Sequence, residues 1–274
     1  MALVTGGGSG IGLMATLALA VNGAKVYIVG RTSEKLERVK DLYSQNIPGQ
    51  IIPITADMTS KESIQKLVTE IESREKALHI LINNAGISSV KVNTDAEDPK
   101  ELQQELFVSE DSNFEEWEQV FRTNVCQLFF TTTAFLPLLQ KGTDLHYGWS
   151  SAVINITSIS GLLKISQHHF AYNSSKAAAI HLTKMLAHEV TSSGLKIRVN
   201  NIAPGVFPSQ MTASGGDGDQ KSGVPKSKYE HIPAGRPGKD EEMASTVLFT
   251  VANQYLNGQT IVVDGGYVLD IGSI

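Results

Sequence analysis

The stretch "ALVTGGGSGIGLMATLALAV" (2–21) decides the fold class of this chain. It opens with a short apolar run, which is typical of a buried strand, and a helical pattern of apolar residues occupies 9–22. The glycines between them permit positive φ and let backbone amides approach a phosphate, while a helix N-terminus favours an anion. A strand, a glycine turn and a helix in this order predict a dinucleotide-binding site; a tight turn without a ligand is the alternative.

Within the turn, "TGGGSGIG" (5–12), Gly7 and Gly12 have the spacing of a phosphate-binding P-loop. Leu13 and Met14 stand where that motif requires Lys and Ser or Thr. The turn therefore favours a dinucleotide and argues against an NTPase.

Short apolar runs and helical patterns alternate along the rest of the chain. The predicted strands cover 2–6, 25–30, 50–55, 79–84, 152–157, 196–203 and 259–264. The predicted helices cover 9–22, 33–45, 113–140, 171–192 and 240–253, and one more begins at a capping box formed by Thr59 and Glu62. This alternation predicts an α/β fold. We expect one Rossmann-type domain over 1–274, a doubly wound parallel sheet of about seven strands with helices on both faces.

Three segments interrupt the alternation. Residues 88–112 are polar and acidic, and 142–150 have the composition of a surface loop. Residues 205–238 are rich in glycine and proline, and a connection of that length often forms a lid over a binding site. We interpret 205–238 as a substrate lid, with a disordered insertion as the alternative for 214–227.

Composition excludes several classes of protein. The chain has 274 residues, a formal net charge of −5 and no stripe of Lys and Arg, so we expect no nucleic-acid partner. No apolar run approaches the roughly 20 residues of a membrane span, and no basic start marks a signal peptide. The single cysteine, Cys126, excludes an internal disulfide, and its apolar neighbours predict a buried, inert thiol. We expect a cytoplasmic protein that does not bind membranes.

The residues after the second strand, "VGRTSEK" (29–35), bear on the choice of cofactor. Dinucleotide folds often place an acidic residue here, on the adenosine ribose, but this chain has Gly30 followed by Arg31. A guanidinium suits a 2′-phosphate, which an acid would repel. We therefore predict NADP(H) rather than NAD(H). A merely solvated Arg31 at a helix start is the alternative.

Four motifs, in order and spacing, resemble the short-chain dehydrogenase/reductase family over essentially the whole chain. They are "TGGGSGIG" (5–12), "NNAG" (83–86), "YNSSK" (172–176) and "PG" (204–205). "PGVFPSQMT" and "NGQTIVVDGG" are most similar to its 3-oxoacyl reductase-like and rhamnolipid-type branch. The resemblance implies a catalytic set of Asn124, Ser158, Tyr172 and Lys176.

The residue types fit carbonyl reduction. Hydride transfer to a carbonyl leaves negative charge on oxygen, where a positioned acid must deliver a proton. Tyr172 and Lys176 are four residues apart on one helical face, and we expect the ammonium to lower the pKa of the phenol. Ser158 follows a predicted strand and is placed to donate a hydrogen bond to the same oxygen. The resemblance gives Asn124 the role of supporting the lysine through ordered water; helix packing is the alternative.

The resemblance and the glycine turn also imply a cofactor site and a substrate wall. The predicted cofactor-binding residues are Gly6, Ser9, Gly10, Ile11, Gly12, Arg31, Thr32, Asp57, Met58, Asn84, Ala85, Gly86, Tyr172, Lys176, Pro204, Gly205, Val206 and Ser209. The predicted substrate-binding residues are Ser160, His168, His169 and Phe207. The two histidines have no carboxylate or cysteine at ligand spacing, so we expect no metal site.

The function predicted from these residues is NADP(H)-dependent reduction of a ketone or aldehyde, reversible as alcohol oxidation. A cofactor-binding regulatory or scaffold subunit, or a cofactor-dependent isomerase, dehydratase or cyclase, are the alternatives. Small residues on the helix at 171–192 and the last strand predict a homodimer or homotetramer. The first strand begins almost at Met1, so either the native start lies upstream or this strand is short.

Overall fold

A computed structural model describes residues 1–209, 211 and 223–273. One parallel sheet runs through it in the order β3-β2-β1-β4-β5-β6-β7. The strands are β1 (Ala2–Thr5), β2 (Lys25–Gly30), β3 (Gln50–Thr55), β4 (Ile80–Asn83), β5 (Ser151–Ile156), β6 (Ile197–Pro204) and β7 (Thr260–Val263). The helices are α1 (Gly10–Val21), α2 (Ser33–Tyr43), α3 (Lys61–Arg74), α4 (Pro99–Gln103), α5 (Phe114–Phe121), α6 (Gln127–Asp144), α7 (Phe170–Ser192), α8 (Asp240–Ala252) and α9 (Tyr267–Ile271). The predicted Rossmann-type fold is confirmed.

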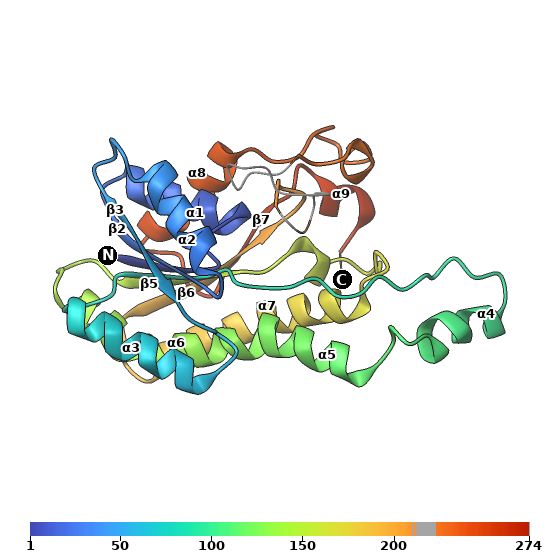
Figure 1. Ribbon diagram of the computed structural model, residues 1–274, viewed down its shortest axis with the longest axis horizontal. Helices are drawn as coiled ribbons and strands as arrows, with labels where there is room; N and C mark the ends of the chain where they lie inside the picture. The colour runs from blue at the N-terminus through green and yellow to red at the C-terminus, as the bar shows by residue number, and fades with distance from the viewer. Residues whose placement is uncertain (210, 212–222, 274) are drawn as a thin grey trace.

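Helices cover both faces of the sheet (Figure 1). Successive strand residues point to opposite faces, so Val4 joins one core and Leu3 the other. α1, α2 and α8 pack on the first face, where Leu13 and Met243 are buried. α3, α6 and α7 pack on the second, where Phe135 is fully buried. Strands buried on both faces explain why the sequence shows continuous apolar runs.

The strand order reverses at β1, which lies between β2 and β4. The chain leaves β1 toward α1 on one face and reaches β4 from α3 on the other, so the two connections diverge at the carboxyl edge of the sheet. Such a switch point opens the crevice in which α/β proteins bind ligands. In register, Thr5 at the end of β1 lies beside Asn83 at the end of β4. The crevice therefore begins at the glycine turn.

The helix predicted over 113–140 is instead two helices joined by a π-helical turn, Arg122–Cys126. α6 continues to Asp144, so it includes the start of the predicted loop at 142–150. Cys126 lies on an exposed face of the π-helical turn, so the prediction of a buried thiol is wrong. Apolar neighbours in sequence did not bury it, because the widened turn changes which residues face the core.

The predicted capping box at α3 is also wrong. Ser60 is the N-cap, and its hydroxyl accepts a hydrogen bond from the backbone of Ser63 (3.3 Å). Thr59 turns the other way and donates both its backbone N–H and its hydroxyl to Asp57 Oδ1, at 2.9 and 2.8 Å. The carboxylate of Asp57 thus competes for the threonine that the capping pattern would use.

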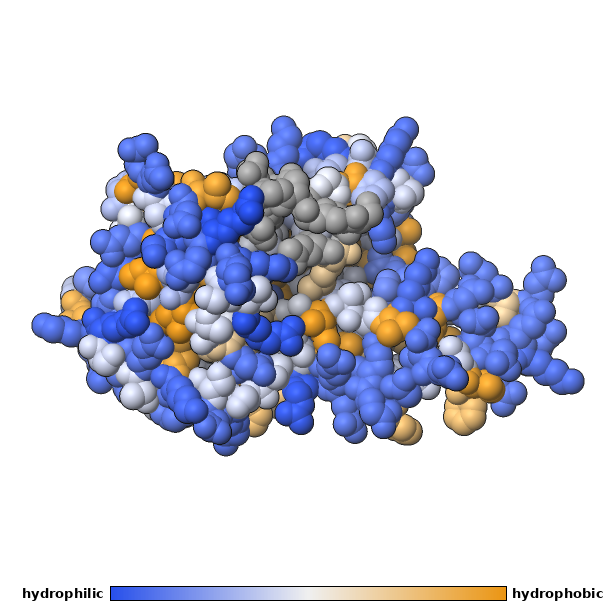
Figure 2. All heavy atoms as spheres, in the orientation of Figure 1, coloured by the Kyte–Doolittle hydropathy of each residue, from blue (hydrophilic) through white to orange (hydrophobic). Residues whose placement is uncertain are grey.

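The acidic segment after β4 projects from the body of the molecule as an arm. We call residues 95–113 the acidic arm; they contain α4 and a π-helical turn, Gln104–Val108, and α4 lies far from the sheet (Figure 1). Hydrophilic side chains cover most of this end in Figure 2. Leu102, Phe107 and Val108 are nevertheless exposed, Phe107 by 77%.

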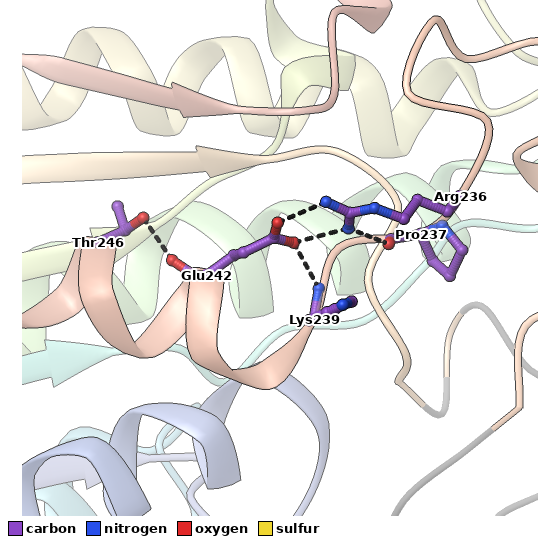
Figure 3. Close-up of polar contacts among 5 residues, drawn as sticks. All are labelled: Arg236, Pro237, Lys239, Glu242 and Thr246. Atoms are coloured by element: carbon purple, nitrogen blue, oxygen red, sulfur yellow. Dashed lines mark hydrogen bonds and ion pairs between the residues drawn. The ribbon is translucent and has the colours of Figure 1, made fainter.

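The predicted lid segment, 205–238, is described at 205–209, 211 and 223–238, and the rest of it lies outside the described residues. Hydrogen bonds to the start of α8 hold the end of this segment in place. Both guanidinium nitrogens of Arg236 donate to the Glu242 carboxylate, at 2.9 and 2.6 Å, and the backbone of Lys239 donates to it at 2.8 Å (Figure 3). These bonds lower the pKa of Glu242 to about 2, and those from Arg236 have the largest effect.

Within the described ranges, no helix is both long and apolar enough to cross a bilayer.

Candidate active site

The glycine turn brings the backbone of β1 close to the start of α1. A Cβ atom on Gly12 would lie 2.1 Å from the carbonyl oxygen of Gly6, so only glycine permits this approach. Gly6 itself has φ +65°, in the left-handed region that favours glycine. Ser9, the N-cap of α1, makes no side-chain capping bond. The first amides of α1 are therefore left for an anion rather than for the protein's own hydroxyl.

Thr5 joins the glycine turn to the "NNAG" turn after β4. Its hydroxyl oxygen accepts the backbone N–H groups of Asn84 (3.0 Å) and Ala85 (3.1 Å). The side-chain amide of Asn84 in turn donates to the carbonyl oxygens of Thr5 and Gly6, both at 3.1 Å. These bonds give the two turns one fixed geometry at the mouth of the crevice.

A cleft of about 490 Å³ lies along these turns at the carboxyl edge of the sheet. Most of the predicted cofactor residues line it: Gly6, Ser9, Gly10, Ile11, Arg31, Thr32, Asp57, Met58, Asn84, Ala85, Gly86, Tyr172, Lys176 and Ser209. Four others are not among its lining residues: Gly12, Pro204, Gly205 and Val206. Gly12 acts beneath the cleft, through the close packing of α1 just described.

Tyr172 and Lys176 meet at one end of the cleft. The Lys176 ammonium lies 5.5 Å from the centroid of the Tyr172 ring and donates to the carbonyl oxygen of Ile156 (3.2 Å). Lys176 is 4% exposed, whereas Tyr172 is partly exposed. The side chain of Ser158, two residues beyond β5, lies near enough to Tyr172 to influence the pKa of its phenol. A strand end and one helix thus bring the three predicted catalytic side chains together.

Burial controls the protonation of this cluster. It raises the pKa of Tyr172, and the neighbouring Ser158 hydroxyl acts in the opposite direction. Burial also lowers the pKa of Lys176 to about 8. The expected lowering of the tyrosine pKa by the lysine is therefore not the direction found here. The phenol is neutral at pH 7, which is the form that donates a proton.

Asn124 lies in the π-helical turn and is 2% exposed. Its side chain accepts from the backbone N–H of Ile87 (2.9 Å) and donates to the carbonyl oxygen of the same residue (2.9 Å). It also donates to the hydroxyl of Ser175, the neighbour of Lys176 (3.0 Å). Asn124 therefore fixes the segment after "NNAG" against α7.

Comparison with known proteins agrees with this arrangement. A family model described as short chain dehydrogenase matches residues 1–220. The chain belongs to the short-chain dehydrogenase family. It is 40% identical over 278 residues to the short-chain dehydrogenase/reductase PhomF of Diaporthe leptostromiformis, covering 97% of this chain and 90% of that relative.

A sequence match and a structural match from Pseudomonas aeruginosa confirm the resemblance to the 3-oxoacyl reductase-like and rhamnolipid-type branch. The rhamnolipids biosynthesis 3-oxoacyl-(acyl-carrier-protein) reductase of Pseudomonas aeruginosa is 34% identical over 271 residues, covering 98% of this chain and 96% of that one. The solved Pseudomonas aeruginosa RhlG/NADP active-site complex matches with a TM-score of 0.78 and 32% identity, covering 97% of this chain and 95% of that one. The family match and these relatives show that this short-chain dehydrogenase is an oxidoreductase.

The predicted substrate residues of this short-chain dehydrogenase do not line the cleft. His168 Nδ1 lies 3.0 Å from the Thr94 hydroxyl, and His169 Nδ1 lies 3.2 Å from the Ser89 hydroxyl, so both rings face the segment that leads to the acidic arm. Phe207 is 2% exposed and belongs to the core on the α1 face.

Packing explains the position of Phe207. A Cβ atom on Gly238 would lie 2.3 Å from the Phe207 ring, so the ring fills the space that this glycine leaves. The fourth predicted substrate residue, Ser160, donates its hydroxyl to Gln167 Oε1 (2.8 Å). The Phe207 side chain therefore packs in the core, and the Ser160 hydroxyl is bonded to Gln167.

Half of the residues that line the cleft were not predicted from the sequence, and Lys35, Thr123 and Gln127 are three polar ones among them. Lys35 lies one helical turn after Arg31, and Thr123 and Gln127 flank Asn124. Gln127 is 1% exposed and donates to the carbonyl oxygen of Ala85 (2.6 Å), behind "NNAG". Lys35 follows Arg31 by four residues and Gln127 follows Asn124 by three, so proximity in sequence to the predicted residues would have identified both.

The described part of this short-chain dehydrogenase holds no group of three or more His, Cys, Asp or Glu side chains arranged to bind a metal ion.

Proposed function

We propose that this chain is an NADP(H)-dependent reductase of ketones or aldehydes that also oxidises the corresponding alcohols. The observation that supports it most is that Tyr172 and Lys176 line one end of a cleft walled by the glycine turn, with Ser158 beside Tyr172. A proton donor, a cation and a hydroxyl at one point are what carbonyl reduction requires. A protein that only binds a dinucleotide has no chemical need for them.

Each residue then has a role at a stated atom. Bound NADPH would supply the hydride to the carbonyl carbon. Tyr172 Oη donates its proton to the carbonyl oxygen, which becomes the alcohol hydroxyl, and the same group accepts that proton in the oxidation direction. Ser158 Oγ donates a hydrogen bond to the same carbonyl oxygen. The Lys176 ammonium stabilises the phenolate that remains on Tyr172.

The cleft fits a dinucleotide. The glycines hold backbone amides at the start of α1, where side chains would block a pyrophosphate. Arg31 and Lys35 line the far part of the cleft, and no acidic residue follows β2 directly. Two cations suit a 2′-phosphate. The relative solved in complex with NADP supports the same choice.

Arg31→Ala is expected to raise the KM for NADPH about 10- to 100-fold and to leave the KM for NADH within about twofold, since only NADPH carries the phosphate. Initial rates with each cofactor measure this. Arg38→Ala is the matched control, because Arg38 is an exposed arginine like Arg31 but lies on α2 and does not line the cleft. An unchanged ratio of the two KM values in Arg31→Ala would show that the cofactor assignment is wrong.

The function itself is tested with a panel of ketones and aldehydes, followed by the loss of NADPH absorbance. Turnover of one or more compounds at a rate well above that without protein is the expected result. Tight NADPH binding without turnover on any of them would favour a cofactor-binding protein instead. NADPH affinity measured by fluorescence separates this outcome from a failure to bind.

We also propose that the chain is a homodimer or homotetramer. Trp117, Phe129 and Met185 are exposed on the neighbouring helices α5, α6 and α7, and Phe249 and Val262 are exposed on α8 and β7. Large apolar side chains at two surfaces are typical of surfaces that copies of a chain bury. Light scattering after size exclusion is expected to give two or four times the chain mass. A monomer at micromolar concentration would contradict the proposal.

A further inference from the structure

The loop from Ser158 to Tyr172 carries a catalytic candidate at each end and contains a strained turn. Gln167 has φ 51° and His168 has φ 65°, two successive residues in the left-handed region. Residues other than glycine adopt this conformation at an energetic cost, because their Cβ atom crowds the following carbonyl oxygen. Among the described residues only Asn46 shares this conformation without being glycine. Contacts elsewhere must therefore hold the turn in place.

Both ends of the Gln167 side chain are bound. Its Oε1 accepts the hydroxyl of Ser160 (2.8 Å), and its Nε2 donates to the hydroxyl of Tyr267 (3.0 Å). Tyr267 begins α9 and is 7% exposed. It packs with Ile159 and Leu163, which belong to the loop from Ser158 to Tyr172, the catalytic loop. The side chain thus joins the loop to the C-terminal segment across a distance of 100 residues in sequence.

The contact continues to the catalytic serine. Ser160 donates its backbone N–H to Ser158 Oγ (3.1 Å), so the residue that holds Gln167 also holds Ser158. Since Ser158 Oγ accepts this bond, its own proton remains to be donated toward Tyr172 or the substrate. Hydrogen bonds therefore connect Tyr267 through Gln167 and Ser160 to the hydroxyl oxygen of Ser158.

We propose that Gln167 is a positioning residue for the reaction, which holds Ser158 in hydrogen-bonding distance of Tyr172 by clamping the catalytic loop to Tyr267. The inference rests on the proposed function, because it assigns Gln167 its role through Ser158. It goes beyond the catalytic set, since Gln167 touches neither the cleft nor the reacting groups. Its function is to hold the two ends of the loop, Ser158 and Tyr172, at a fixed distance from each other.

Gln167→Gly tests the proposal most directly, because glycine relieves the left-handed strain while it removes the clamp. We expect a melting temperature equal to or above that of the wild type, and a kcat about tenfold lower with an unchanged Kd for NADPH. In the profile of kcat against pH, the limb that reports Tyr172 ionisation is expected to move to higher pH. The reason is that the influence of Ser158, which favours the phenolate, is weakened. A purely structural glutamine would not move this limb.

Three further single variants and one double variant separate the clamp from the backbone. Tyr267→Phe keeps the packed ring and removes the hydroxyl, so it is expected to lower kcat as Gln167→Gly does. The double variant Gln167→Gly/Tyr267→Phe is expected to have a kcat no lower than that of Gln167→Gly alone. Gln167→Glu accepts from both hydroxyls and is expected to retain kcat within about threefold. Asn46→Gly, an exposed left-handed position far from the loop, controls for the glycine and is expected to leave kcat unchanged.

A kcat within twofold of wild type and an unmoved pH limb in Gln167→Gly would overturn the proposal, as would additive effects in the double variant. If Gln167→Gly does not fold, Tyr267→Phe decides by the same two measurements. If the wild type turns over no carbonyl compound, the proposed function has failed separately. The clamp is then tested by amide hydrogen exchange over 158–170, where unchanged protection in Gln167→Gly would overturn it.

Discussion

Tyr172→Phe is expected to lower kcat for carbonyl reduction by about 10³-fold, within the 10²- to 10⁴-fold range of general acid catalysis. Phenylalanine keeps the ring beside Lys176 but has no proton to give to the developing oxyanion. Water is a poor substitute, since the proton must arrive at one position within a partly buried cluster. Steady-state rates of NADPH oxidation measure the loss.

The Kd for NADPH is expected to stay within about threefold in this variant, because the glycine turn and Arg31 are untouched. Tyr255→Phe is the matched control: Tyr255 is fully exposed and lies outside the cleft. A Tyr172→Phe enzyme that retains more than a tenth of the wild-type kcat would exclude Tyr172 as the proton donor.

Lys176→Met is expected to lower kcat about 10²- to 10³-fold and, at the same time, to stabilise the fold at pH 7. The ammonium is 4% exposed, and burial lowers its pKa to about 8. Holding this charge out of water costs folding free energy, while loss of its bond to Ile156 removes about 1 kcal/mol of stabilisation. We expect a net gain of about 1–2 kcal/mol in the free energy of unfolding.

The gain in stability of Lys176→Met over the wild type is expected to decrease as the pH rises. Between about pH 8 and 10.5 the unfolded lysine binds a proton that the folded lysine has released, so the stability of the wild type rises with pH in this window. The advantage of Lys176→Met is therefore full below pH 8 and disappears toward pH 10.5. Urea unfolding at pH 7 and pH 10 measures it.

Lys184→Met is the control for this variant, since Lys184 is exposed on the same helix and has no role in the cleft. Its stability is expected to change by less than about 0.5 kcal/mol at either pH. A Lys176→Met protein that is less stable than the wild type at pH 7 would mean that the buried ammonium stabilises the fold.

Local patterns predicted much of this molecule because the fold uses them directly. Buried strands require continuous apolar runs, and a glycine turn that a Cβ atom would block leaves a signature in the sequence. Tyr172 and Lys176 lie on one helix, so their spacing alone brings them to the same site. The order of motifs then identified the family.

Other features depend on contacts between distant segments, which no local pattern records. The sequence could not show that Gly238 leaves a space in the core that the Phe207 ring fills. It also could not show that the Ser160 hydroxyl is bonded to Gln167. The direction of the Tyr172 pKa depends on burial, which the spacing of two residues cannot give.

The acidic arm also determines how the whole molecule behaves in an electric field. It has seven acidic side chains and one lysine, a surplus larger than the net charge of −5 of the entire chain. The catalytic body is thus close to electroneutral, and the isoelectric point of about 5.8 reflects its appendage. A protein trimmed of the arm would sit near its isoelectric point at neutral pH and lose the mutual repulsion that keeps its copies in solution.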